Sequence, residues 1–232
     1  MSVATSHPPP TSAAPARREA GRWPSIAKLL LLAGPVLLFT GYALHPDLPQ
    51  DAAAALPEVT DARGMTLAAK LIIAVGSLVM IPLILQVRHQ MAAHRGRSVA
   101  TAGAALVTIG MASNALSQAT YGYLLWWVTD PDVSRAAGVR VADVATTETA
   151  ATLPVSFLAV PVFGVGLLLV AGGLWRARSV PGWAPIVLGL GTIASVALPV
   201  GWPMLVVGGP ITAAFAATLQ SAPDRSPATM TS

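Results

Sequence analysis

The chain contains no cysteine and few charged residues. Cysteine is missing from all 232 positions, which excludes a disulfide framework, a thiolate metal site and a cysteine nucleophile. Charged residues make up only 10% of the sequence, whereas an ordinary soluble domain carries roughly 25%. A chain so poor in charge and 54% hydrophobic is not a disordered protein, a nucleic-acid module or a soluble enzyme. The composition predicts an all-α polytopic membrane protein whose main partner is the lipid bilayer, with no nucleic acid involved.

Ionisable side chains are also missing where intramembrane chemistry needs them. The four histidines lie in a tail, in loops or at span ends, and no Asp or Glu falls inside an apolar segment. Haem proteins of the cytochrome b type use histidines inside the membrane, and proton-coupled transporters use Asp, Glu or His there. Phosphate-binding glycine loops are missing too, because every glycine cluster lies within an apolar segment. We therefore expect no catalytic residue, no metal site and no cofactor.

Apolar segments that alternate with polar connections predict a bundle of six transmembrane helices. They cover residues 26–44, 66–87, 98–127, 150–175, 183–200 and 202–219. A spanning helix needs about 20 apolar residues, which the first four segments provide. The last two are shorter and meet at Gly201 between Pro199 and Pro203, which predicts a tight helical hairpin. The alternative is one span plus a re-entrant segment within residues 183–219.

The remaining ends of the chain are polar. Residues 1–25 are rich in Pro, Ser, Thr and Ala, and residues 220–232 are similarly polar, so we expect disordered cytoplasmic tails. The transmembrane domain then covers residues 26–219. Two longer connections, 45–64 and 129–149, are not apolar enough to span the membrane. The second contains the stretch 133–144, whose spaced charges predict a short amphipathic helix on the outer surface.

Charge and tryptophan placement predict the orientation. With the N-terminus inside, the inner segments hold ten Lys and Arg residues and the outer segments hold four, which favours N-in and C-in. All six tryptophans fall at span ends, where the indole ring prefers the membrane interface. Of the 14 basic residues 12 are arginine, a bias typical of GC-rich genomes. We therefore expect a multi-pass protein of the bacterial inner membrane.

A polar helical face is the only candidate site in the apolar segments. Lys70 lies about one turn inside the outer end of the second span, and Ser77, two turns further along this span, extends the same polar strip inward. Asn114, Ser117, Gln118 and Tyr121 share one face of the third span, because their offsets are three, four and seven.

Two interpretations of this face remain open. In the first, it forms an outward-facing pocket in which Lys70 binds an anionic or carbonyl-bearing ligand, and Glu148 or a nearby Asp is the resting counter-ion. In the second, Lys70 extends to the lipid headgroups and the other side chains join neighbouring helices by hydrogen bonds.

No motif selects one activity. The missing chemistry favours a non-enzymatic structural, accessory or sensory membrane subunit. The alternative is a small-solute transporter or ligand-binding membrane protein that uses the pocket around Lys70 and the third span. Glycine pairs in the last three spans allow helices to approach closely. The helices in contact belong either to one bundle, to two copies of the chain in a homo-oligomer, or to this chain and a membrane partner protein.

Overall fold

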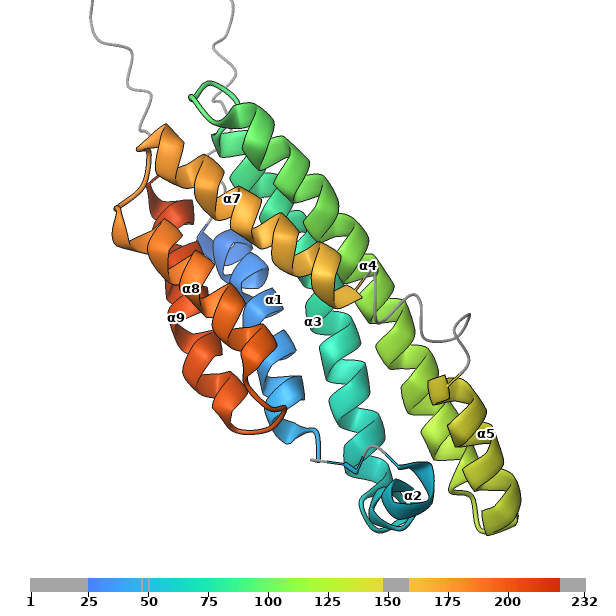
Figure 1. Cartoon of the computed structure of the whole chain (residues 1–232). Coiled ribbons are helices and arrows are strands. Elements are labelled where there is room, and N and C mark those ends of the chain that lie inside the picture. The colour runs from blue at the N-terminus through green and yellow to red at the C-terminus, as the bar shows by residue number, and fades with distance from the viewer. Residues whose placement is uncertain (1–24, 47, 50, 148–158, 222–232) are drawn as a thin grey trace, which may run out of the picture.

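The fold is entirely helical in the part of the chain that the structure describes. The computed structural model describes residues 25–46, 48–49, 51–147 and 159–221. These residues form eight α-helices and no strand (Figure 1). Most of both predicted tails, the predicted counter-ion Glu148 and the beginning of the predicted fourth span lie outside the described residues.

Six apolar helices form a closed ring. Each helix packs against the next one along the ring, and the last packs against the first (Figure 1). The ring consists of α1 (Ser25–Leu44), α3 (Arg63–Gln90), α4 (Arg97–Val128), α7 (Phe163–Ala177), α8 (Trp183–Ala197) and α9 (Pro203–Gln220). Because neighbouring helices run antiparallel, the connections after α1, α3, α7 and α8 lie at the two ends of the bundle (Figure 1). This architecture confirms the predicted helical membrane bundle, and the chain is an integral, multi-pass membrane protein.

The helices differ in length more than the sequence predicts. Five are long and apolar enough to cross a membrane, if α7 is counted with the π-helical turn at 159–162 that precedes it. The α4 helix has 32 residues and is about 48 Å long at 1.5 Å per residue, well beyond a hydrocarbon core of about 30 Å. The α8 helix has only 15 residues, or about 22 Å. The predicted hairpin between α8 and α9 is present, although α8 ends three residues earlier than expected, at Ala197.

Glycines bring the ring helices into backbone contact. A Cβ atom at Gly76 of α3 would clash with the backbone nitrogen of Leu38 in α1. On the other side of the ring, a Cβ at Gly103 of α4 would lie 2.7 Å from the carbonyl oxygen of Gly166 in α7. These glycines therefore serve packing within one bundle, where small residues allow close approach.

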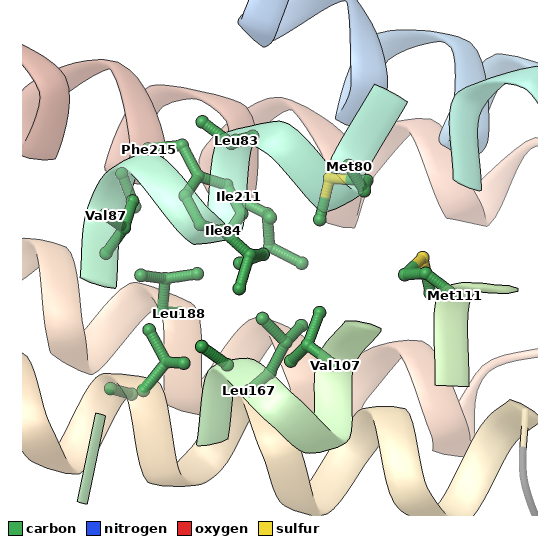
Figure 2. Close-up of a cluster of buried hydrophobic side chains, with 14 of the residues drawn as sticks. Met80, Leu83, Ile84, Val87, Val107, Met111, Leu167, Leu188, Ile211 and Phe215 are labelled. Atoms are coloured by element: carbon green, nitrogen blue, oxygen red, sulfur yellow. The ribbon is translucent and has the colours of Figure 1, made fainter. Parts of the chain in front are cut away.

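Apolar side chains fill the centre of the ring over much of its length. Figure 2 shows side chains from α3, α4, α7, α8 and α9 meeting there, among them Ile84, Val107, Leu167, Leu188 and Phe215. Each of these five is at most 1% exposed. The bundle is thus a packed core and not an open channel at this level.

The two ends of the bundle differ in charge. We call the end with the connections after α1 and α4 the cap end, and the opposite end the basic end. The described charged residues at the basic end are all basic: Lys28, Arg88, Arg95, Arg97, Arg176 and Arg178. The cap end holds all the acidic residues that the structure describes.

Two further helices form a small cap on the protruding ends of α3 and α4. They are α2 (Ala52–Asp61), which the sequence analysis missed, and α5 (Arg135–Thr147), which matches the predicted amphipathic helix. The side chain of Asp51 caps α2 by accepting a hydrogen bond from the Ala54 backbone N–H at 2.9 Å. Leu56, Val59, Leu125, Val128 and Ala142 form a second apolar core between these helices. The apolar face of α5 is therefore buried against α2 and α4.

A salt bridge joins the end of α4 to the start of α3. The Arg63 guanidinium donates hydrogen bonds to the Trp126 carbonyl oxygen at 2.6 and 2.9 Å and to the Asp130 carboxylate at 2.9 Å. The same guanidinium lies 3.9 Å from the centre of the Trp126 ring. The backbone N–H of Asp132 and the Arg63 guanidinium hold the pKa of Asp130 below its usual value.

Candidate functional site

Asn114 is the centre of a hydrogen-bond network between three helices. Its side-chain N–H donates to the Ser77 hydroxyl on α3 at 2.8 Å. Its side-chain oxygen accepts from the Tyr42 hydroxyl on α1 at 3.3 Å and from the Gln118 amide at 3.5 Å. Ser77 in turn donates to the carbonyl oxygen of Ile73. The predicted polar face of α4 therefore lies inside the bundle, where it joins α4 to α1 and α3.

Tyr42 is the member of this network that sequence reasoning did not include. It stands next to Gly41, where a Cβ atom would lie 2.8 Å from the backbone nitrogen of Ile73. This close approach of α1 and α3 brings the Tyr42 hydroxyl within reach of Asn114. Gly34 and Gly41 are seven residues apart and share a face of α1, which is the one sequence signal of this contact.

Lys70 is buried between α3 and α4, next to this network but not in it. Its side chain is 9% exposed, and its ammonium group lies 5.3 Å from the centre of the Tyr121 ring. A Cβ atom at Gly122 would lie 2.8 Å from the Cβ of Lys70, so the glycine makes room for the lysine stem. Among the described residues, none accepts a hydrogen bond from Lys70 and none forms an ion pair with it.

The other predicted site residues that the structure describes, Gln118 and Ser117, do not form a common site with Lys70. Gln118 reaches Asn114 through its amide nitrogen, but no described residue donates a hydrogen bond to its buried side-chain oxygen. Ser117 is half-buried and belongs neither to the network nor to the cavity described next. Glu148 lies outside the described residues.

A cavity of about 240 Å³ lies beside Asn114 in the cap-end half of the ring. Side chains from α1, α4, α8 and α9, from the turn after α8 and from the first residues of the α7 segment line it. Ten of its thirteen lining residues are apolar, and the three polar ones are Tyr42, Asn114 and Ser195. The Ser195 hydroxyl donates to the carbonyl oxygen of Thr192 at 2.8 Å. Asn114 is the one residue of the predicted site that borders this cavity.

The turn between α8 and α9 closes one side of this region. Gly201 in this turn has a φ of 116°, a backbone conformation that favours glycine. Its N–H donates to the carbonyl oxygen of Tyr42 at 3.1 Å and so fixes the turn to the end of α1. This hydrogen bond holds the α8–α9 hairpin against Tyr42, whose hydroxyl lines the cavity.

Metal-binding side chains do not gather anywhere in the described part of the chain. No three His, Cys, Asp or Glu side chains come together among these residues. In comparisons with known proteins, no family model matches the chain, and no curated protein or solved structure is detectably similar to it.

Proposed function

We propose that the protein is a non-enzymatic membrane subunit, sensory or accessory, that binds a small ligand in the cavity beside Asn114. The cavity itself is the observation that supports this proposal. Ligand sites are concave and mostly apolar, with a few polar groups that orient the ligand. One amide and two hydroxyls in an apolar surround match that description. All three are already positioned by hydrogen bonds to the protein.

Binding fits the packing better than transport does. The cavity occupies the cap-end half of the ring, while the side chains in Figure 2 fill the ring at the level of Ile84 and Leu188. A transported solute would have to pass this core, whereas a bound ligand has only to enter from one side. Lys70 and Tyr121 do not line the cavity, so the proposed site is the Tyr42 side of Asn114 and not the Lys70 side.

We propose further that all six ring helices cross the bacterial inner membrane, with the basic end in the cytoplasm. The support is the uneven distribution of Lys and Arg, which marks the cytoplasmic side of membrane proteins. The short α8 helix packs between α7 and α9 and runs alongside both, which favours a sixth crossing (Figure 1).

Filling the cavity tests the proposed function. Ala159 lines the cavity and is 2% exposed, so Ala159→Leu places extra side-chain volume inside it. Ala112 is exposed on α4 near the same level, and Ala112→Leu is the matched control. We expect at least one of 4-fluoroacetophenone, 4-fluoroethylbenzene and 4-fluorobenzoate to raise the Tm of the purified full chain and of Ala112→Leu. The rise should be lost in Ala159→Leu.

Two outcomes of this experiment would contradict the proposal. One is that no compound of the panel raises the Tm of the unaltered chain. The other is a rise that persists in Ala159→Leu, because the compound would then bind elsewhere.

A further inference from the structure

The cavity also restricts the chemistry of its ligand. We propose, on the basis of the function proposed above, that the ligand is an uncharged molecule of about one ring that carries a carbonyl group. Tyr42 and Asn114 recognise this carbonyl.

Volume limits the size of the ligand. An engineered apolar cavity of about 150 Å³ accepts benzene. A cavity of about 240 Å³ therefore accommodates one ring with a short substituent, or an aliphatic molecule of similar bulk. A sugar nucleotide or a whole lipid is too large to be enclosed.

The lining excludes a charged ligand. None of the thirteen described residues of the lining is ionised at neutral pH, since the only titratable one among them is the phenol of Tyr42. Burying a charge without a partner costs far more free energy than hydrogen bonds from one amide and two hydroxyls can offset. Lys70, the one described Lys or Arg buried between ring helices, does not border the cavity.

The mouth of the cavity is apolar as well. Val160, Val196, Leu198 and Val200 line the cavity and are also 38–59% exposed, so they form its rim. They belong to the start of the α7 segment, to the end of α8 and to the turn that follows. Helix packing is looser here, because a Cβ at Gly164 of α7 would come no closer than 3.9 Å to any α8 atom. A neutral apolar molecule passes such a rim at little cost, and an ion does not.

The hydrogen bonds define the polar group of the ligand. Asn114 uses one side-chain N–H for Ser77, and the Tyr42 hydroxyl donates to the Asn114 oxygen over a long 3.3 Å. Such a long bond is weak, since O–H donors prefer about 2.7–2.8 Å. A ligand carbonyl can replace this bond by accepting from the Tyr42 hydroxyl, with the second N–H of Asn114 as a further donor. An acceptor on an otherwise apolar molecule therefore fits the site best.

Ligand-observed fluorine NMR on the full chain in nanodiscs tests this inference. The probes are the three compounds named above, which share a fluorinated ring and differ in carrying a ketone, no polar group or a carboxylate. Line broadening in empty nanodiscs corrects for partitioning into lipid. We expect 4-fluoroacetophenone to bind about three- to ten-fold more tightly than 4-fluoroethylbenzene, the range that one net hydrogen bond provides. 4-Fluorobenzoate should bind weakest.

Tyr42→Phe provides the matched variant, because it removes only the hydroxyl that donates to the ligand. We expect this variant to keep the binding of 4-fluoroethylbenzene and to lose the preference for the ketone. A separate Tm measurement shows whether the variant is folded. Tyr123→Phe is the control, because it removes an exposed phenolic hydroxyl that does not line the cavity, and it should retain the preference for the ketone.

The outcomes separate this inference from the proposed function. Tightest binding of benzoate, or an unchanged ketone preference in Tyr42→Phe, would overturn the inference while leaving a ligand site in the cavity. If none of the probes binds in a manner that Ala159→Leu abolishes, the proposed function fails together with it.

Discussion

Asn114 shows how one polar residue can be tolerated inside an apolar bundle. Its side chain contacts Tyr42, Ser77 and Gln118, so a group that would be costly in hydrocarbon is satisfied by three other side chains. Hydrogen bonds between membrane helices contribute about 0.6 kcal/mol each on average, because the separated helices find other partners. The network is therefore worth more for fixing the positions of α1, α3 and α4 than for the stability of the bundle.

Lys70 differs from Asn114 because no described residue neutralises it. Lys70→Met keeps an unbranched side chain against Gly122 and removes the buried charge. We expect the free energy of unfolding to stay unchanged or to rise by up to about 1 kcal/mol. A lysine at the centre of a span costs roughly 2.5–3.5 kcal/mol, and a lysine near the end of a span costs less. The contact with the Tyr121 ring offsets only part of this smaller cost. Reversible unfolding in mixed detergent micelles measures this change.

Tyr121→Leu controls for the contact with the aromatic ring. It should destabilise the unaltered chain more than it destabilises Lys70→Met, because the cation–π contact exists only in the former. If Lys70→Met instead lowers the free energy of unfolding by more than about 1 kcal/mol, the ammonium group stabilises the fold. That result would contradict the expectation that an unpaired buried charge is destabilising.

The sequence predicts part of the site because helical periodicity is local. Offsets of three, four and seven place Asn114, Gln118 and Tyr121 on one face whatever surrounds the helix. The partner on α1 could not be predicted, because Tyr42 meets Asn114 across 72 positions of the sequence. Nor does any local pattern reveal a cavity, whose walls come from α1, α4, α7, α8 and α9.

At the scale of the helices, the contact between α1 and α3 depends on glycine. Gly76→Ala puts a methyl group within 2.8 Å of the Cα of Leu38, and a backbone atom cannot move aside as a flexible side chain can. We expect this substitution to lower the free energy of unfolding by about 1–3 kcal/mol, as overpacking of a core does. The Tm of the purified chain reports this loss.

Gly172→Ala on α7 is the matched control, because nothing lies within 4 Å of its added Cβ. It should be neutral or slightly stabilising, since alanine has the higher helix propensity. Equal Tm values for the two variants would contradict the close α1–α3 contact.

Helix boundaries show where hydropathy stops being informative. Apolar runs locate the ring helices, and α4 matches its predicted run to within one residue at each end. The α3 helix begins three residues before its run, at Arg63, where the Arg63 guanidinium bonds to Trp126 and Asp130 at the end of α4. The α2 helix has a capping residue at Asp51, yet it lies in a connection that hydropathy assigns to a loop. Its apolar side chains are buried by packing against α4 and α5. The local sequence of α2 does not reveal this tertiary contact.

At the scale of the whole molecule, the fold sorts charges that the sequence intersperses. Three stretches of the chain supply the charges of the basic end, at Lys28, at residues 88–97 and at residues 176–178, and no described acid is among them. The acids gather in the cap, where Asp130 pairs with Arg63. An end whose described charged residues are all basic is expected to lie on the cytoplasmic side, because Lys and Arg in short loops resist translocation.

Single cysteines introduced into this cysteine-free chain test the orientation and the number of crossings together. Ala53 and Ala137 are exposed in the cap, and Ala92 is exposed at the basic end, so none of these cysteines disturbs a core. We expect an impermeant thiol reagent added to intact cells to label the first two and to reach the third only after lysis. Gly182 and Pro199 are exposed at the two ends of α8, and a sixth crossing predicts that only a cysteine at Pro199 reacts from outside. Labelling at Ala92 in intact cells would reverse the orientation, and equal labelling at both ends of α8 would reduce the crossings to five.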